Sequence, residues 1–414
     1  MEKERRGRFA LMMVLSLVVA MMITASCSQS LAHNKSTAKP TAAPFSVAFQ
    51  MTGNVYPLGY YSVNLKIGNP PKSFDFDIDT GSGLTWVQCD APCQACTLPR
   101  ARLYKPKNKP LRCSDTLCRN TPGALPCHHP NEQCDYQLAY ADQGSSLGVL
   151  LNDHFFFPTT STGVSLTQLL AFGCGYDQHN PGPHLPPPTA GVLGLGRAEA
   201  TIVSQLHANG VLPNVFGHCM SRTGGGLLFF GDHPLRSSPN TWIPLLPVSS
   251  NPHYSSGSAQ VVFGGKLTGA KGLQFIFDSG SSYTYFNAQV YQSTLNLIRN
   301  NLNGKPLKNA PEDKTLEVCW KAAKPIKSIS EVRNYFQSIA IQFATPTNVQ
   351  QLLLMPEDYL IVSKNGNPCL GILNGSQHQE LGNLNVIGDI FMQDKWVIYD
   401  NEKQRIGWFP ANCK

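Results

Sequence analysis

One short pattern occurs twice in this chain of 414 residues, and it restricts the fold more than any other feature. A run rich in apolar residues ends in Asp79-Thr-Gly-Ser82, and a similar run ends in Asp278-Ser-Gly-Ser281. A second motif, two apolar residues and a glycine, lies further along the chain from each aspartate. Its glycine is Gly194, 115 residues after Asp79, in the first case and Gly388, 110 residues after Asp278, in the second. Two lobes with the same internal order are the simplest explanation of such a duplication.

Strand signals dominate the rest of the chain. Charged residues make up only 14% of the chain, and 35 glycines and 31 prolines fit a loop-rich β protein better than a coiled coil or a helical bundle. Short apolar or alternating runs bounded by turn residues predict strands at 61–67, 225–230, 259–263 and 395–399. Helical periodicity is clearest at 198–209, 287–303 and 329–335. The expected fold is mainly β and bilobal.

The repeated aspartate motif suits acid–base chemistry. The glycine in each motif permits a sharp turn after a strand, and the neighbouring hydroxyls can hydrogen-bond the carboxylate. Two such carboxyl groups brought together cannot both ionise, so they share one proton. The ionised group can then deprotonate a water while the protonated one polarises a peptide carbonyl. This chemistry requires neither a metal nor another cofactor.

The N-terminal residues are typical of an export signal. A basic start is followed by a 15-residue run that is apolar apart from Ser16, and small residues come next. Such a run is short for a membrane span, which needs about 20 residues. A cleaved signal peptide is therefore predicted, with an uncleaved anchor as the alternative. The expected parts are a signal peptide (1–27), a short pro-segment (28–53), a first lobe (54–240) and a second lobe (241–414).

Further features fit export. Asn34 and Asn374 each begin an Asn-x-Ser glycosylation motif. The net charge is +7, but no run of Lys or Arg occurs after the first ten residues, which argues against nucleic-acid binding. We expect a protein of the secretory pathway, extracellular (apoplastic) or vacuolar, with no membrane attachment once the signal is removed.

The cysteines indicate an oxidising compartment. Of the 13 cysteines, Cys27 falls at the expected cleavage site, and the remaining even number predicts six disulfides. The alternative is a zinc site, because Cys93-x-x-Cys96 and Cys127-His-His129 have the spacing of metal ligands. The export signal favours disulfides, since exported thiols oxidise. No metal site is predicted.

With these motifs in place, the chain resembles the pepsin-fold aspartic proteases, and most closely the plant nepenthesin-type and nucellin-like members, from residue 60 to residue 413. The resemblance implies two pseudo-symmetric β-barrel-like lobes with a central cleft. It also implies that Asp79 and Asp278 are the catalytic pair around the lytic water, and that polypeptides are the substrates. Residues expected to support the pair are Thr80, Gly81, Ser82, Ser279, Gly280 and Ser281.

The same resemblance assigns a flap over the cleft. Tyr140 matches the flap tyrosine, and Trp86 matches the tryptophan that braces it. Ala141 replaces the usual glycine and Gln143 is an apparent insertion, so the reach of the flap differs from the family pattern.

The family pattern further implies a disulfide connectivity that spacing alone does not provide. Carried over to this sequence, the pairs are Cys89–Cys93, Cys96–Cys174, Cys113–Cys134, Cys118–Cys127, Cys219–Cys413 and Cys319–Cys369.

Asp77 departs from the family pattern. Strand alternation places it on the same face as Asp79, where the second lobe has Ile276 and the family usually has an apolar residue that lines the cleft. One interpretation is a third carboxylate beside the cleft that accepts Lys or Arg from the substrate. The other is a carboxylate turned to solvent or held by local hydrogen bonds.

The sequence therefore predicts a secreted, monomeric aspartic endopeptidase with an acidic optimum, inhibited by statine-type compounds. Two alternatives stay open. One is a non-catalytic binding protein on the same scaffold, as in plant glycosidase-inhibitor relatives that have lost the aspartates. The other is a zymogen that stays latent until residues 28–53 are removed.

Overall fold

The computed structural model describes residues 46–107, 109–159, 165–180, 187–239, 241–378 and 381–414, all of which belong to one compact unit. The predicted signal peptide and Asn34 lie outside the described residues. Within the described part of the chain, no helix is long and apolar enough to cross a membrane.

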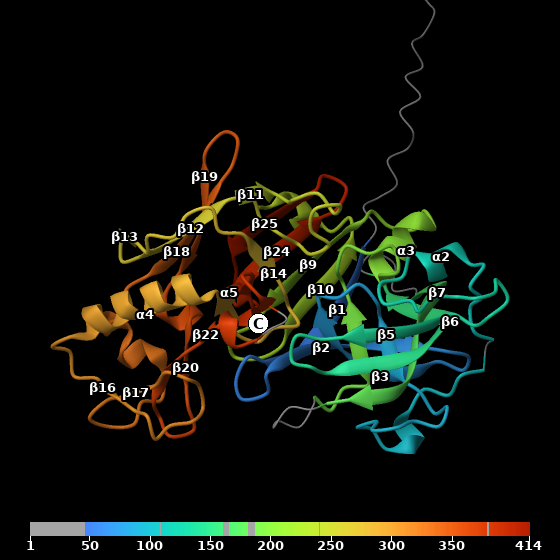
Figure 1. The fold of residues 1–414 in the computed structure, drawn as a ribbon, viewed down its shortest axis with the longest axis horizontal. Helices are drawn as coiled ribbons and strands as arrows, with labels where there is room; N and C mark the ends of the chain where they lie inside the picture. The colour runs from blue at the N-terminus through green and yellow to red at the C-terminus, as the bar shows by residue number, and fades with distance from the viewer. Residues whose placement is uncertain (1–45, 108, 160–164, 181–186, 240, 379–380) are drawn as a thin grey trace, which may run out of the picture. The chain divides into compact units, whose positions relative to one another are not determined.

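A large mixed sheet contains most of the first lobe and the last strands of the chain (Figure 1). In spatial order its strands are β11 (Thr241–Pro244), β25 (Arg405–Pro410), β24 (Lys395–Asp400), β9 (Val215–Met220), β10 (Gly226–Gly231), β1 (Ser46–Asn54), β2 (Tyr60–Ile67), β3 (Lys72–Asp79), β8 (Gly191–Gly194), β4 (Trp86–Gln88), β7 (Ser165–His179), β6 (Ser145–Pro158) and β5 (Asp135–Ala139).

Smaller sheets build the rest of the second lobe. Their strands, sheet by sheet, are β13 (Lys266–Leu267), β12 (Ala259–Phe263), β18 (Ile339–Ala344) and β19 (Val349–Leu354); β14 (Phe275–Phe277), β23 (Asn385–Ile387), β15 (Thr284–Phe286) and β22 (Ile372–Asn374); β16 (Lys308–Asn309) and β17 (Trp320–Lys321); β20 (Leu360–Val362) and β21 (Pro368–Leu370). The mainly β, two-lobed prediction is confirmed.

The duplicated motifs occupy equivalent places in the two lobes. In the first lobe β8 lies parallel to β3 and antiparallel to β4. In the second lobe β23 lies parallel to β14 and antiparallel to β15. Each apolar-apolar-Gly motif therefore lies beside the strand that leads to its aspartate. A side chain at Gly194 or Gly388 would collide with the backbone of the crossing segment.

The helices agree with the predicted windows but are shorter. Thr201 accepts a hydrogen bond from the backbone of Ser204 and starts α3 (Ile202–Ala208) three residues after Ala198. Asn287 caps α4 (Ala288–Leu302) in the same way. The window 329–335 forms two 3₁₀ turns. The remaining short elements are α2 (Thr116–Arg119), α5 (Asp389–Met392), η1 (Arg100–Arg102), η2 (Pro234–Ser237), η3 (Ile329–Glu331), η4 (Arg333–Tyr335), η5 (Pro356–Asp358) and η6 (Gly375–Gln377).

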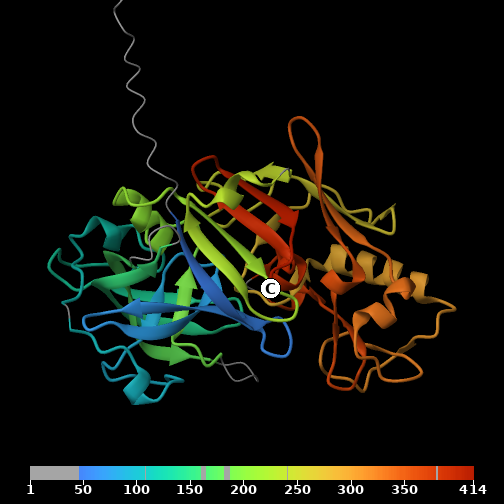
Figure 2. The same ribbon diagram turned by 180° about the vertical axis from the view of Figure 1, so that it is seen from behind.

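The pro-segment expected over residues 28–53 stays a prediction, and its last part, from Ser46 on, belongs to the large sheet. Strand β1 pairs with both β2 and β10 inside the large sheet, as seen from behind in Figure 2. Val47, Phe49 and Met51 alternate along β1 and are buried, so the strand contributes to the core. That alternation was the available signal for a strand.

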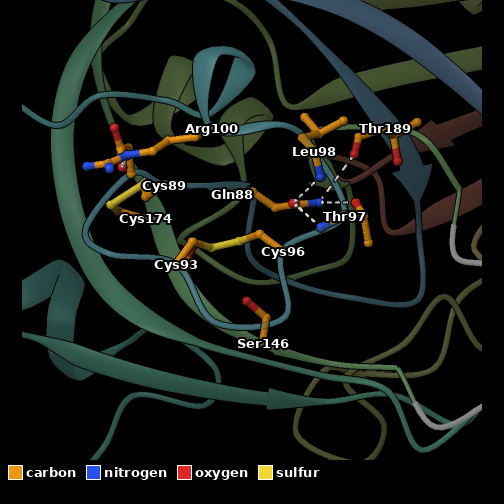
Figure 3. Close-up of a disulfide and its surroundings, with 12 residues drawn as sticks. Gln88, Cys89, Cys93, Cys96, Thr97, Leu98, Arg100, Ser146, Cys174 and Thr189 are labelled. Atoms are coloured by element: carbon orange, nitrogen blue, oxygen red, sulfur yellow. Dashed lines mark hydrogen bonds and ion pairs between the residues drawn. A yellow bond between two sulfur atoms is a disulfide. The ribbon is translucent and has the colours of Figure 1, made fainter.

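Four of the six expected disulfides are wrong, namely Cys89–Cys93, Cys96–Cys174, Cys113–Cys134 and Cys118–Cys127. The structure instead has Cys89–Cys174 and Cys93–Cys96 (Figure 3). It also has Cys113–Cys127 and Cys118–Cys134. The pairs Cys219–Cys413 and Cys319–Cys369 form as expected.

The physical reason for the correction is strand pairing. Strand β4 runs parallel to β7, and the backbone N–H of Cys89 donates to the carbonyl of Gly175 at 2.8 Å, so Cys89 lies against Cys174. Cys93 and Cys96 remain in the following loop and pair with each other. Cys118 and Cys134 are both buried in one apolar cluster, which brings them together.

Candidate active site

The two aspartates lie at the ends of equivalent strands. Asp79 is the last residue of β3 and Asp278 follows β14 directly. Each carboxylate accepts a hydrogen bond from the glycine two residues later, from Gly81 N–H to Asp79 Oδ1 at 2.8 Å and from Gly280 N–H to Asp278 Oδ1 at 2.9 Å. The tight turn thus orients each carboxylate from its own lobe.

Reciprocal hydrogen bonds join the lobes beneath the aspartates. The backbone N–H of Thr80 donates to Ser279 Oγ at 3.1 Å, and the backbone N–H of Ser279 donates to Thr80 Oγ1 at 2.9 Å. Each hydroxyl also donates across the interface, Thr80 to the carbonyl of Phe277 and Ser279 to the carbonyl of Ile78, both at 3.0 Å. All four contacts are buried, so they hold the two strand ends in register.

The carboxylates face each other at close range. A methyl group placed on Gly280 would lie 2.5 Å from Asp79 Oδ1 and 3.2 Å from Asp278 Oδ1, and one on Gly81 would lie 2.5 Å from Asp278 Oδ1. Glycine is therefore required at both turns. Burial and the charge of Asp278 raise the pKa of Asp79, while the hydrogen bond from Gly81 opposes the shift. The arrangement favours one shared proton.

The outer serines differ between the lobes. Ser281 Oγ donates to Asp278 Oδ2 at 2.8 Å, as the resemblance implies. Ser82 lies close enough to lower the pKa of Asp79, but its buried hydroxyl makes no hydrogen bond of ordinary geometry with the described residues.

The flap lies over the first lobe's side of the site. The chain turns between β5 and β6, where Tyr140 N–H donates to the carbonyl of Gly144 at 2.8 Å. Gln143 adopts a left-handed conformation (φ 69°), which accommodates the extra residue in the turn. Trp86 Nε1 donates to the Tyr140 hydroxyl at 2.6 Å, so the expected brace is present.

A cavity of about 710 Å³ lies between the flap and the aspartates. Residues of both lobes line it, including both expected catalytic aspartates and the flap residues Trp86 and Tyr140. Residues that line it include Asp77, Asp79, Ser82, Trp86, Tyr140, Thr189, His253, Ile276, Asp278, Ser281 and Tyr285.

Asp389 is a buried acid near the site that the sequence analysis missed. It begins α5, directly after the glycine of the second apolar-apolar-Gly motif, where the first lobe has Leu195. Neither carboxylate oxygen has a hydrogen-bond partner in the described part of the chain. Burial, and then the charges of Asp278, Asp79 and Asp77, raise its pKa well above the usual range. Comparing the two lobes at this position is the signal that would have found it.

His253 is a second residue that the sequence analysis missed. It lines the cavity, and its Nδ1 lies 3.2 Å from the carbonyl oxygen of Gly81. The segment that carries it is held by Arg197, whose guanidinium donates to the carbonyls of Leu246 and His253. This segment belongs to the expected second lobe (241–414), and nothing in its composition indicated a role at the site.

The cysteines do not provide thiolate ligands for a metal. Cys113, Cys118 and Cys127 have sulfur atoms close to one another, as do Cys319 and Cys369 beside Asp313. All five cysteines are in disulfides, which removes their thiolates.

The site's geometry agrees with the comparisons with known proteins. Residues 61–232 match the family described as Xylanase inhibitor N-terminal, and residues 262–410 match that described as Xylanase inhibitor C-terminal. An aspartic proteinase of Oryza sativa subsp. japonica is 43% identical over 379 residues, which cover 89% of this chain and 91% of the relative. The chain belongs to the pepsin family of aspartic proteases.

More distant relatives lie within the same family. Aspartic proteinase nepenthesin-2 of Nepenthes gracilis is 28% identical over 377 residues, which cover 86% of this chain and 78% of the relative. Aspartic proteinase 39 of Arabidopsis thaliana is 27% identical over 381 residues, with 86% and 75% covered. The chain is accordingly an aspartic-type peptidase.

Solved structures share the pepsin-family fold at low identity. Basic 7S globulin from soybean has a TM-score of 0.69 at 19% identity, covering 89% of this chain and 98% of the other. The structure described as edgp has a TM-score of 0.70 at 17% identity, covering 90% and 96%. These likenesses concern the fold alone.

The flap brace leads to a quantitative expectation for this aspartic protease. Trp86→Phe and Tyr140→Phe each remove the same hydrogen bond, worth about 1–1.5 kcal/mol, so each is expected to lower kcat/KM about tenfold. The double variant should lose no more than either single variant. Steady-state kinetics on one peptide test this double-mutant cycle, and additive losses would contradict a shared contact.

Proposed function

We propose that the protein is a secreted aspartic endopeptidase that hydrolyses internal peptide bonds of polypeptides at acidic pH. The observation that carries the proposal is the reciprocal set of hydrogen bonds between Thr80 and Ser279, which holds Asp79 and Asp278 face to face. A cavity open to both aspartates and covered by the flap suits an extended polypeptide.

In the proposed mechanism the pair carries one proton. The ionised carboxylate accepts a proton from a water, whose oxygen attacks the peptide carbonyl carbon. The protonated carboxyl donates its proton to the carbonyl oxygen, which forms a neutral tetrahedral intermediate. The intermediate collapses when the carboxyl that took the water proton donates it to the amide nitrogen, the other carboxylate accepts a proton from a hydroxyl of the intermediate, and the C–N bond breaks. Both carboxyl groups return to their starting states.

The pair also accounts for an acidic optimum. Loss of the shared proton leaves two facing carboxylates with no acid to polarise the carbonyl. Because Asp79 is buried beside the charge of Asp278, the site retains that proton more strongly than an isolated aspartate would. Activity should therefore decline as the pH rises towards neutrality.

Secretion rests on the N-terminal signal and on the twelve cysteines joined in six disulfides. Asn374 stays a proposed glycosylation site. Its side-chain carbonyl accepts hydrogen bonds from Ser376, at the end of β22.

A non-catalytic binding role is the second candidate, and the description of the matching family as a xylanase inhibitor is what favours it. One assay separates the candidates: incubation of the purified protein with denatured haemoglobin at about pH 3–5 and at neutral pH, with and without a statine-type inhibitor. Inhibitable cleavage at acidic pH supports the endopeptidase. Cleavage only after N-terminal shortening supports a latent zymogen. Maximal cleavage at neutral pH contradicts the acidic optimum, and no cleavage in any arm favours the binding role.

A further inference from the structure

Asp77 lines the cavity beside the catalytic pair, and among the described residues one of its two carboxylate oxygens has no hydrogen-bond partner. Its Oδ2 accepts a hydrogen bond from Thr189 Oγ1 at 3.1 Å. Its Oδ1 is buried and has no hydrogen-bond partner among the described residues. A buried acceptor that lacks a donor costs free energy, so a ligand that supplies a donor gains by it.

No cation of the described residues compensates this carboxylate. The titratable groups that act on it are acids or a phenol: Asp79 on the same strand, Tyr60 on the neighbouring β2, and Asp389 on α5. The other titratable residues lining the cavity in the described part of the chain are Asp142, Asp278, Tyr140, Tyr285, His253 and His378, and neither Lys nor Arg is among them. The aspartates that line the cavity therefore outnumber its two histidines.

A hydrogen-bonded part of the cysteine-rich region lies behind Thr189, the partner of Asp77. Gln88 is buried, and its side chain bonds the backbone of Thr97 and of Leu98 through Oε1 and the carbonyl of Thr189 through Nε2 (Figure 3). The two disulfides Cys89–Cys174 and Cys93–Cys96 flank this network. The carbonyl of Thr189 accepts a hydrogen bond from Gln88, which holds Thr189 in place. The hydroxyl of Thr189 can then orient Asp77 through the hydrogen bond to Oδ2.

A second buried polar group lines the same cavity. Gln178 is 5% exposed, and its Nε2 has no hydrogen-bond partner in the described part of the chain. At the equivalent position of the second lobe the cavity is lined by the apolar Ile276. At this pair of positions the first lobe therefore offers a polar group and the second lobe an apolar one.

We propose that Asp77 is a specificity-determining residue that binds the Lys or Arg side chain of a substrate residue next to the scissile bond. The position follows from the strand: Asp77 precedes Asp79 by two residues, which is about 6.6 Å along β3 on the same face. An ammonium or guanidinium group would supply the donor that Oδ1 lacks. This inference rests on the proposed endopeptidase function.

The binding has a definite dependence on pH. Burial, with a smaller contribution from the charge of Asp79, raises the pKa of Asp77 to about 8, so the free protein holds this carboxyl protonated under acidic conditions. A cation binds the ionised form, so its binding releases a proton. The preference for a basic over an apolar side chain should then rise with pH, by up to about tenfold per pH unit below 8.

The test uses two statine-type peptides that differ only in the side chain beside the statine hydroxyl, aminobutyl in one and butyl in the other. Calorimetric Kd values are measured for the full chain between about pH 4 and 6, in buffers of different ionisation enthalpy to count released protons. Asp77→Asn removes the charge but retains an acceptor for Thr189. Asp75→Asn is the matched control, since Asp75 lies on the same strand, bonds Asn64, and does not line the cavity.

The wild type is expected to prefer the aminobutyl peptide increasingly as pH rises and to release a proton on binding it. Asp77→Asn should lower that preference at least about tenfold and abolish its pH dependence, and Asp75→Asn should change neither. An equal preference in the wild type and Asp77→Asn, or no proton release by the wild type, overturns the proposal.

The proton count needs no variant, so the proposal stays testable if Asp77→Asn does not fold. Hydrolysis of peptides without a basic preference would overturn this inference but not the proposed function. Preferential binding of the aminobutyl peptide by a protein that hydrolyses no peptide would support this inference and contradict the proposed function. Binding of neither peptide would count against both the inference and the proposed function.

Discussion

Replacing Asp278 by Asn is expected to lower kcat/KM for peptide hydrolysis by about 10³-fold or more and to leave the protein folded. The amide has nearly the same size as the carboxyl group, and its oxygen can still accept from the backbone of Gly280. The amide NH2 takes the place of Oδ2 and can donate to the hydroxyl of Ser281. It cannot share a proton with Asp79, so either the base or the acid of the pair is lost. Asp79→Asn should behave in the same way.

Stability should change in the opposite direction from activity. A carboxyl group whose pKa is raised on folding binds its proton more tightly in the native state, so its contribution to stability falls as the pH rises above the unfolded value of 3.8. Asp278→Asn removes one cause of the raised pKa of Asp79. Urea denaturation at neutral pH should therefore find the variant at least as stable as the wild type.

The matched control is Asp75→Asn, which removes the same charge from the same strand as Asp79 without touching the cavity. It should retain both activity and stability. Residual proteolysis within tenfold of the wild type in either Asn variant of the catalytic pair would contradict the assigned mechanism.

Replacing His218 by Gln is expected to stabilise the protein by about 3 kcal/mol at about pH 4 relative to its effect at neutral pH. His218 lies on β9 and is fully buried, between Phe216 and Met220 on the strand. Its Nε2 lies 3.2 Å from the Tyr399 hydroxyl, and its Nδ1 has no hydrogen-bond partner in the described residues. Burial therefore lowers its pKa from 6.5 to about 3.

The sign follows from the protons bound. Between about pH 3 and 6.5 the unfolded chain binds a proton at this histidine and the native state does not, so the free energy of unfolding falls as the pH falls. Gln can still bond Tyr399 but does not titrate. Denaturation curves of both proteins across this range measure the difference.

His129→Gln provides the control, because His129 is exposed and its replacement should leave the pH dependence unchanged. An equal pH dependence of stability in the wild type and His218→Gln would show that this histidine does not limit stability in acid.

The buried carboxyl groups and His218 have opposite effects on how the free energy of unfolding depends on pH. The buried carboxyl groups around the cavity lower stability as the pH rises, and His218 lowers it as the pH falls. We therefore expect an optimum of stability at moderately acidic pH.

Local patterns in the chain were sufficient for the fold class and for the catalytic pair. A strand is indicated by alternation over a few residues, and the Asp-Thr/Ser-Gly-Ser turn depends only on the four residues that form it. Both can therefore be recognised from residues that are close together in the sequence. Strand β1 was missed although Val47, Phe49 and Met51 alternate, because the surrounding residues are polar. The family resemblance supplied the roles of Trp86 and Tyr140.

The remaining features depend on residues far apart in the chain. Cys89 pairs with Cys174 because β4 and β7 lie parallel, and His218 lies beside Tyr399 because β24 from the end of the chain pairs with β9. The hydrogen bond to one oxygen of Asp77 likewise comes from Thr189, which lies 112 residues further along the chain. A sequence pattern specifies which groups a chain offers, while burial, charge neighbours and disulfide partners are properties of surfaces that exist only once distant segments have packed.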